Sequence, residues 1–257
     1  MISGGAPLNA DLARFFGGVG VEVLEGYGLT ETTGPATVHR VGQAKPGTVG
    51  PPLAGVDVRI SEAGEILLAG YLLFDRYWDD EEATAEAFDD GLFRTGDFGE
   101  IDEDGHVVIT GRMKDLIVTA GGKNIAPGAL ETQVAAHSLV SHAVVIGDDR
   151  PFVSALVTLD VQTLGAWASD HDRQVTAPGT LIEELADDPE LHAELQEAVD
   201  AANRQVSRAE GIRAFRVLRS DFTVASGELT PTMKVRRSRV IANHADVVES
   251  MYERRKS

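Results

Sequence analysis

Hydrophobic and polar residues alternate with period two in the middle of the chain, which is the pattern of half-buried strands. Val56–Ile60 alternates strictly, residues 61–64 have turn composition, and residues 65–69 supply a second strand for a hairpin. A second hairpin is predicted at residues 103–105, because Asp-Gly suits a tight turn, with residues 106–110 as its returning strand. The middle of the chain therefore predicts a small β-rich unit.

Before and after this β-rich unit, the apolar residues do not alternate with period two, and they predict helices as well as strands. The mostly apolar run at residues 19–24 predicts a strand that ends an α/β layer, followed by a loop rich in Gly and Thr. Asp79 begins an acidic stretch that ends at Phe88, which predicts a short surface helix with Asp79 as its N-cap and not a cation site. Beyond residue 111 the predicted strands are 142–147, 152–160 and 214–218. Helices are predicted at 128–137 and 235–254. Two more helices are predicted from their first residues: one begins at a Thr180/Glu183 capping box, and one begins at Asp188-Pro189 and carries an apolar stripe from Leu191 to Val206.

The change of pattern places a domain boundary at Met113-Lys114. The expected fold class is α+β, with the end of an α/β subdomain at residues 1–35, a small β-rich, barrel-like subdomain at 36–113, and an α+β domain at 114–257. A boundary directly beside Arg112 suggests that the last domain turns about a hinge at this point.

Charge and composition narrow the classes of function. The formal net charge is −18 and the pI is about 4.7, so phosphate backbones and anionic lipid would be repelled and no nucleic-acid partner is expected. No cysteine is present, which excludes disulfides, thiolate metal sites and a cysteine nucleophile. The first residues lack the features of a signal peptide, and no run approaches the roughly 18 apolar residues of a transmembrane helix, so a cytoplasmic protein is expected.

Four short polar motifs occur in order along the chain: Tyr27-Gly28-Leu29-Thr30-Glu31, Thr95-Gly96-Asp97, Gly111-Arg112-Met113-Lys114-Asp115 and Pro231-Thr232-Met233-Lys234. Thr30 offers a hydroxyl to a phosphate oxygen, and Glu31 offers a hard carboxylate to Mg²⁺. Asp97 offers two acceptors to a ribose diol, while Arg112 and Lys234 bring positive charge. Together these groups meet the needs of a nucleotide monophosphate joined to an acyl group.

Three other kinds of site are not supported, because the residue spacing that each requires is absent. A phosphate-binding P-loop would need Gly at position 117 and Ser or Thr at position 124, where the chain has Ile117 and Asn124. The seven histidines show no metal-ligand spacing. No Gly-x-Ser-x-Gly elbow occurs, which argues against a serine hydrolase.

In content, order and approximate spacing, the four motifs resemble the second half of an adenylate-forming (AMP-binding) enzyme, and they are closest to long-chain fatty acyl-CoA ligases. The resemblance implies that Tyr27 stacks on the adenine of ATP or AMP, that Thr30 contacts the phosphates and that Glu31 holds Mg²⁺. It also implies that the loop of Gly4, Gly5 and Ala6 lines the adenine site, together with Gly26.

The later motifs resemble the remaining parts of such a site. Asp97 resembles the ribose-binding aspartate, and Arg112 resembles its partner, which contacts ribose and phosphate. Lys234 resembles the late catalytic lysine that bridges the substrate carboxylate and the α-phosphate. Lys114 resembles the hinge lysine about which the mobile C-terminal domain turns, and Gly121-Gly122 would then line the pantetheine tunnel for CoA.

The implied activity is that of an acid-thiol ligase, which joins a fatty acid to ATP, gives acyl-AMP and pyrophosphate, and then lets the CoA thiol attack the acyl carbon. Nothing in the sequence matches the family's Ser/Thr/Gly-rich loop that ends in Pro-Lys-Gly and grips pyrophosphate. The chain by itself is therefore expected to be inactive. Three alternatives remain open: an acyl-AMP ligase that serves a carrier protein, a non-catalytic nucleotide-binding or interaction protein, and a ligase completed by a separately encoded N-terminal half.

Overall fold

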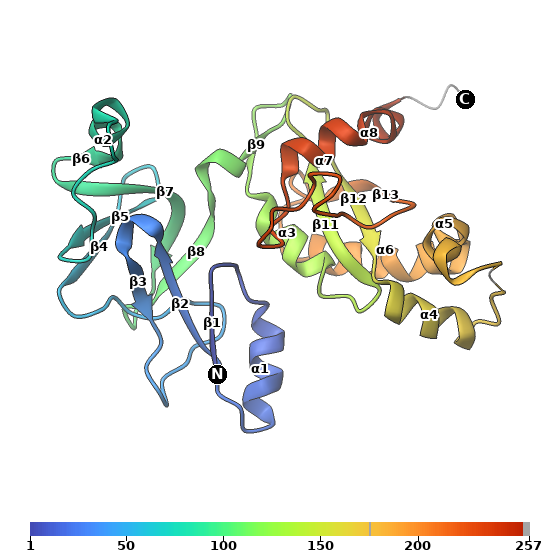
Figure 1. Cartoon of the computed structure of the whole chain (residues 1–257), viewed down its shortest axis with the longest axis horizontal. Coiled ribbons are helices and arrows are strands. Elements are labelled where there is room, and N and C mark those ends of the chain that lie inside the picture. The colour runs from blue at the N-terminus through green and yellow to red at the C-terminus, as the bar shows by residue number, and fades with distance from the viewer. Residues whose placement is uncertain (175, 254–257) are drawn as a thin grey trace. The chain divides into compact units, whose positions relative to one another are not determined.

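The chain forms two compact units, Met1–Asp115 and Leu116–Ser257, which are described separately. The computed structural model describes residues 1–174 and 176–253 (Figure 1). Both units combine helices with sheets, so the predicted α+β class is confirmed. Within the described residues no helix has both the length and the apolar character needed to cross a membrane.

The first unit begins with a three-stranded sheet in the order β1-β2-β3. Strand β1 (Ile2–Gly4) is parallel to β2 (Leu24–Leu29), and β3 (Gly34–Val38) is antiparallel to β2. Helix α1 (Ala10–Gly18) connects β1 to β2 and begins at Asn9, whose side chain accepts hydrogen bonds from two backbone N–H groups of its first turn. A one-turn helix, η1 (Thr30–Thr32), follows β2.

The strand predicted at residues 19–24 is wrong. Val19 is the C-cap of α1, and the chain then turns at Gly20, whose φ is 86°, before β2 starts at Leu24. The apolar residues of this run terminate a helix and lead into a strand, which a short apolar pattern cannot distinguish from a strand of its own.

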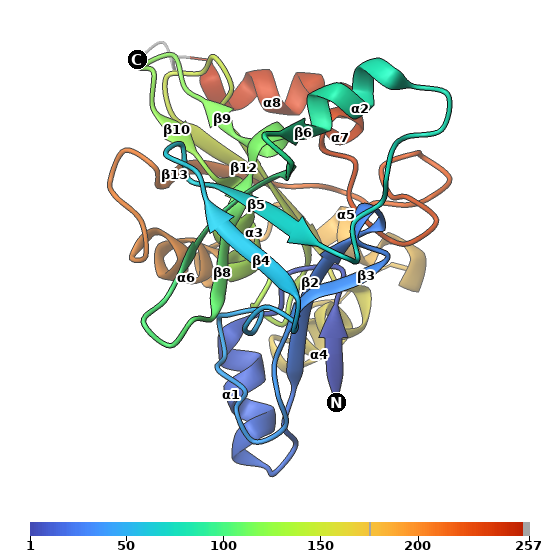
Figure 2. The same cartoon turned by 90° about the vertical axis from the view of Figure 1, so that its left-hand side faces the viewer.

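The second sheet of this unit has five strands, and its antiparallel hairpins confirm both sequence predictions. Strand β4 (Val56–Ile60) pairs with β5 (Glu65–Gly70), as Figure 2 shows, and β7 (Leu92–Ile101) pairs with β8 (Val107–Arg112). The order is β4-β5-β7-β6, where β6 (Phe88–Asp89) is a short edge strand and β8 branches from β7. Among the described strands the sheet does not close, so the barrel-like form is not realised.

The predicted acidic helix is α2 (Glu81–Ala87), but its N-cap is Asp80 and not Asp79. The Asp80 carboxylate accepts a hydrogen bond from the Ala83 N–H, while Asp79 has a φ of 53° and forms the turn before the helix. A second one-turn helix, η2 (Met113–Asp115), ends the unit after β8.

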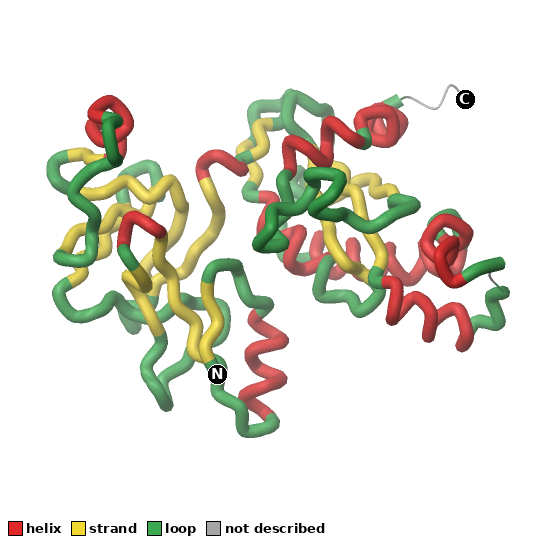
Figure 3. Tube along the Cα trace, viewed as in Figure 1, coloured by secondary structure: helices red, strands yellow, loops and turns green. Residues whose placement is uncertain are grey.

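The second unit is built around a three-stranded sheet with helices on both faces (Figure 3). Strand β11 (Val140–Ile146) is antiparallel to the central strand β12 (Val153–Leu159), which is parallel to β13 (Ile212–Val217). Every residue of β12 is buried: Val153, Ala155, Val157 and Leu159 enter one apolar core and Leu156 enters the other, while Ser154 and Thr158 make side-chain hydrogen bonds. The hairpin of β9 (Ile117–Val118) and β10 (Asn124–Ile125) precedes the sheet.

Helices from two parts of the chain cover the two faces of this sheet. One core takes side chains from α3 (Pro127–Val134), α4 (Val161–Asp170), α5 (Leu181–Leu185) and α6 (Pro189–Asn203). The other core takes side chains from α7 (Arg237–Asn243) and α8 (Ala245–Tyr252). A short helix, η3 (Pro178–Thr180), precedes α5.

The helix opened by Asp188-Pro189 is confirmed, and two other details are corrected. The Thr180 hydroxyl contacts the carboxylate of Glu184, so the capping box with Glu183 is not formed. The single helix predicted at 235–254 is two helices that break at His244, whose side chain contacts the buried Glu228; position 254 lies outside the described residues.

Candidate functional site

Asp97 is the centre of the candidate site in the first unit. It lies opposite Arg112 in the β7/β8 ladder, so the two side chains meet across neighbouring strands. Arg112 donates from Nε to Oδ1 of Asp97 at 2.6 Å and from Nη2 to Oδ2 at 3.4 Å. The hydroxyl of Tyr27, which comes from β2, donates to Oδ2 at 2.7 Å. The structure therefore joins three predicted site residues in one network.

Burial strengthens this network. The Asp97 side chain is 4% exposed, whereas that of Arg112 is 52% exposed and keeps one side open to solvent. The hydrogen bond to Asp97 raises the pKa of Arg112, and burial together with the Asp97 charge raises the pKa of the Tyr27 phenol. Both groups thus remain donors, and their three hydrogen bonds leave about one of the roughly four acceptor positions of this fixed carboxylate for a ligand hydroxyl.

Tyr27 lies deeper than the predicted stacking on adenine suggests. The residue is 7% exposed and packs in the apolar core of the second sheet, so its ring offers little open surface. Its bond to Asp97 joins residues 70 positions apart, and no pattern in the sequence indicates that contact.

The glycines on both sides of Tyr27 have a structural reason. A Cβ atom on Gly28 would lie 2.1 Å from the carbonyl oxygen of Gly34, and one on Gly26 would lie 3.1 Å from the carbonyl oxygen of Thr37. Both oxygens belong to β3, which pairs with β2. Close packing of the β2/β3 hairpin therefore requires the absence of a side chain at Gly28.

Gly4 is the last residue of β1, Gly5 and Ala6 follow it, and all three are exposed. Gly4 lies beside Gly26 in the parallel β1/β2 register, so the structure brings these two predicted ligand-lining positions together. Gly5 has a φ of 82°, a left-handed conformation that favours glycine.

Glu31 is held by a tyrosine that the sequence did not indicate. Tyr77 donates from its hydroxyl to Oε1 of Glu31 at 2.8 Å, and burial, with a smaller effect from Glu31, raises the pKa of Tyr77 to about 12. Tyr77 therefore stays protonated and orients the carboxylate. Thr30, the preceding residue of η1, is exposed.

These residues fit a magnesium ion only in part. Glu31 supplies one carboxylate, and the described part of the chain contains no group of three His, Cys, Asp or Glu side chains placed to hold a metal. Mg²⁺ is commonly bound by one or two carboxylates, with substrate phosphates and water completing its coordination. Glu31 fits that role.

Lys234 is exposed and lies on the returning side of a tight turn in the second unit, opposite Thr230. The Thr230 N–H donates to the carbonyl of Lys234 at 2.8 Å, and the Lys234 N–H donates to the Thr230 hydroxyl at 3.0 Å. Met233 adopts a φ of 63° to close the turn, and residues Leu229 and Val235 pair at its base. The ammonium group is thus presented to solvent on an ordered backbone.

The two other predicted positions, Gly121-Gly122 and Lys114, are also exposed. Gly121 and Gly122 form the tip of the β9/β10 hairpin, where the Gly122 N–H donates to the Thr119 carbonyl at 2.8 Å and Gly122 has a φ of 76°. Lys114 lies in η2, at the end of the first unit. Lys234 and Gly121-Gly122 belong to the second unit.

Two family models match the chain. Residues 1–78 match the AMP-binding enzyme model, and residues 114–256 match the AMP-binding enzyme C-terminal domain model. The chain belongs to the AMP-binding enzyme family.

Relatives and solved structures agree with this membership. The chain is 49% identical over 253 residues to the long-chain-fatty-acid–CoA ligase FadD15 of Mycobacterium tuberculosis, covering 98% of this chain and 42% of the relative. It is 35% identical over 270 residues to the long-chain-fatty-acid–CoA ligase ACSBG2 of Gallus gallus, covering 97% of this chain and 35% of the relative. The chain thus spans less than half the length of these relatives.

The fold is also found among solved structures. The ATP-bound RpMatB-BxBclM chimera B1 matches with a TM-score of 0.70 and 30% identity over 96% of this chain and 46% of the other. The AMP complex of o-succinylbenzoate coenzyme A synthetase from Bacillus subtilis matches with a TM-score of 0.68 and 23% identity over 92% of this chain and 44% of the other.

Proposed function

We propose that this chain is the adenosine-holding and lysine-bearing portion of a long-chain fatty acid–CoA ligase that works in the cytoplasm. The observation that carries the proposal is the buried Asp97 carboxylate, which Arg112 and Tyr27 fix in place while an acceptor position remains for a ribose hydroxyl. The 49% identity to a long-chain-fatty-acid–CoA ligase supplies the class of substrate.

The proposed reaction has two steps. In the first, a carboxylate oxygen of the fatty acid attacks the α-phosphorus of ATP, and the bond to pyrophosphate breaks to give acyl-AMP. In the second, the CoA thiol loses its proton, its sulfur attacks the acyl carbon, and the bond to AMP breaks to give the thioester. Both steps develop negative charge on phosphate oxygens, which positioned cations stabilise.

Each site residue has a role in this proposal. Asp97 and Arg112 orient the ribose, with Gly4, Gly5, Ala6 and Gly26 lining the adenine side. Thr30 donates its hydroxyl to a phosphate oxygen, and Glu31 would hold Mg²⁺, which when bound neutralises phosphate charge.

The second unit would supply the groups that differ between the two steps. Lys234 places its ammonium charge against the α-phosphate and the substrate carboxylate during acyl-AMP formation. Gly121-Gly122 borders the pantetheine arm of CoA in thioester formation, and Lys114 is the hinge for the change between steps.

A chimera tests the proposal, because the chain spans 42% of its Mycobacterium tuberculosis relative. In the chimera, this chain replaces the matched residues of that ligase, and fatty-acid-dependent exchange between ATP and pyrophosphate is measured. We expect exchange by the chimera and none by this chain alone. A folded chimera without exchange would contradict the proposal, and full-rate exchange by the chain alone would contradict the expected inactivity.

The remaining alternatives are separated in the same preparation. Transfer of the acyl group to a phosphopantetheinyl carrier in preference to CoA would identify an acyl-AMP ligase. Recovery of exchange when the uncovered part of the relative is added as a separate polypeptide would support a ligase assembled from two chains.

A further inference from the structure

The turn that carries Lys234 rises from a base that is fixed by one buried carboxylate, that of Glu228. This residue is 5% exposed, although it lies only six positions before the exposed lysine. Its Oε2 accepts a hydrogen bond from the Ser226 hydroxyl at 2.6 Å. Its Oε1 accepts from the Asn243 amide at 3.1 Å and contacts Nε2 of His244 at 2.9 Å.

These donors come from two separate segments. Ser226 belongs to the loop before the turn, whereas Asn243 is the last residue of α7 and His244 joins α7 to α8. Burial alone would raise the pKa of Glu228, but the three side-chain partners outweigh it and lower the pKa. The side chain is therefore an ionised clamp between the loop and the helices.

The backbone of Glu228 is equally constrained. Its carbonyl accepts from the Arg236 N–H at 2.7 Å, and the next residue, Leu229, is 2% exposed in the core that α7 and α8 share with the sheet. Leu229 then pairs with Val235. Both strands of the turn are thus anchored where they leave the core.

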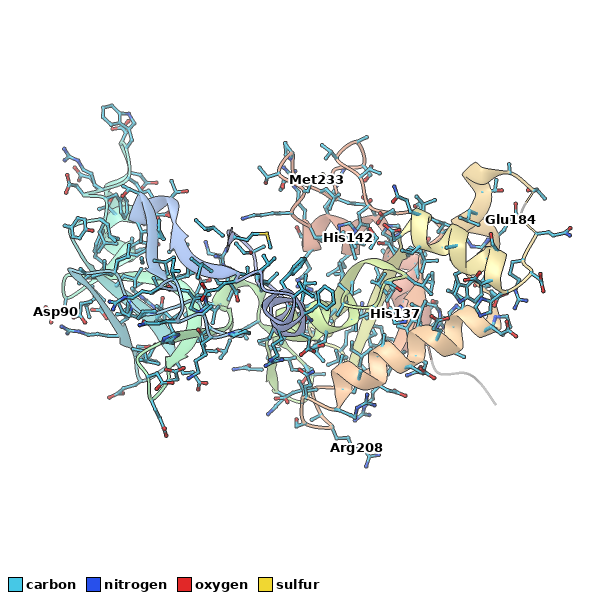
Figure 4. All side chains as sticks on the ribbon, turned by 90° about the horizontal axis from the view of Figure 1, so that it is seen from below. Asp90, His137, His142, Glu184, Arg208 and Met233 are labelled. Carbon is cyan, nitrogen blue, oxygen red and sulfur yellow. The ribbon has the colours of Figure 1, made fainter. Side chains whose placement is uncertain are left out.

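Beyond this base the turn makes only internal hydrogen bonds among the described residues. The contacts between Thr230 and Lys234 close it, and Met233 holds a left-handed φ of 63° that a non-glycine residue rarely adopts. Such a conformation persists only where the surrounding structure constrains it. Figure 4 shows Met233 on this outer loop, with His142 of β11 nearer the body of the unit.

We propose that Glu228 is a positioning residue for Lys234: its clamp on Ser226, Asn243 and His244 fixes the base of the turn and thereby the lysine that leaves the turn directly above this base. This inference rests on the proposed function, in which Lys234 serves acyl-AMP formation and not thioester formation. Loss of the clamp must then slow the first step and spare the second. A residue that only maintains the fold would affect both.

The test measures the two steps separately in the chimera. The first is fatty-acid-dependent ATP–pyrophosphate exchange, and the second is conversion of supplied acyl-AMP and CoA to acyl-CoA. Glu228→Gln keeps the side-chain volume and removes the charge, and Glu228→Ala removes the clamp. We expect the first step to fall about tenfold in the Gln variant and up to about a hundredfold in the Ala variant, because misplacement of a catalytic group by about 1 Å has effects of that size.

The second step should stay within about twofold of the wild-type rate in both variants. The matched control is Glu197→Gln, an exposed glutamate on α6, which should change neither step. Hydrogen exchange on the unfused chain provides an independent reading: the amides of Thr230 and Lys234 should exchange at least tenfold faster in the Glu228 variants, while those of β12 stay protected.

The outcomes separate this inference from the proposed function. A chimera without either step refutes the proposed function, and the exchange of the Thr230 and Lys234 amides still tests the clamp. If Lys234→Ala abolishes the first step while Glu228→Gln and Glu228→Ala leave it unchanged, the positioning role is refuted. Equal losses in both steps would also overturn it, in favour of a purely structural residue.

Discussion

The hydrogen bond from Tyr27 to Asp97 can be tested by removing a single oxygen atom. Tyr27→Phe keeps the ring in its apolar core but leaves Oδ2 of Asp97 with only the 3.4 Å contact to Arg112. A hydrogen bond to a charged group contributes about 1.5–3 kcal/mol. Because Asp97 is only 3% exposed, the free energy lost with this bond should lie within that range. We expect the free energy of unfolding of the first unit to fall by about 2 kcal/mol.

The assay must distinguish the two units. Hydrogen exchange of β7 and β8 peptides is followed at increasing urea, where a loss of about 2 kcal/mol lowers the midpoint by roughly 1.3 M for a slope of about 1.5 kcal/mol/M. Fluorescence of Trp167 reports the second unit, because that residue is 6% exposed there, whereas Trp78 is 97% exposed and changes little on unfolding.

Two controls make the result decisive. Tyr71→Phe removes a hydroxyl from a residue that is 77% exposed and should leave the midpoint within about 0.3 M. The Trp167 transition should be unchanged in both variants. A midpoint for Tyr27→Phe that matches the Tyr71→Phe control would refute the role assigned to this bond.

Two further predictions concern stability. Gly28→Ala should destabilise the first unit by about 3 kcal/mol or more, because its Cβ would lie 2.1 Å from a carbonyl oxygen. Gly34→Ala is the control and should be tolerated, because a Cβ there would have no atom within 4 Å. Equal urea midpoints for the two variants would contradict this prediction. Burial alone would raise the pKa of Asp221, but hydrogen bonds from His142, Ser141 and Thr158 lower it below its ordinary value of 3.8. The ionised carboxylate therefore stabilises the folded unit above about pH 4, and this stabilisation is lost as the pH falls through the lower pKa of the folded state. Asp221→Asn should therefore cost the second unit about 1 kcal/mol at pH 7, given its partial exposure, and the difference should shrink below pH 4; a constant difference in Trp167 unfolding would refute the assignment.

The sequence predicted the hairpins correctly, because a hairpin depends on residues that are close together in the chain. The alternation at Val56–Ile60 and the Asp-Gly turn before β8 each indicate a hairpin whose two strands are only a few residues apart. The break at His244 was not predicted from the sequence. At this residue the side chain contacts Glu228, sixteen positions earlier, and such a long-range contact leaves no local pattern.

The candidate site shows the same division. The motif order indicated Asp97 and Arg112, and the strand register brings them together. The contacts that hold the site came only from the structure: Tyr27, predicted to stack on adenine, binds Asp97 from another sheet, and Tyr77 binds Glu31 across 46 positions. Residues that contact a ligand can be recognised in a sequence motif. The residues that orient them cannot, because they come from distant parts of the chain and meet them only in the folded structure.

The central claim is that this chain carries the adenosine-holding residues and the lysine of an adenylating ligase. Lys234→Ala in the chimera tests it most directly, with acyl-AMP formation and thioester formation measured as separate steps. The account predicts a loss of about 10²- to 10³-fold in acyl-AMP formation, the size expected when one group that stabilises developing charge is removed, with thioester formation from supplied acyl-AMP within about twofold of wild type. Undiminished acyl-AMP formation in a folded Lys234→Ala chimera would contradict it.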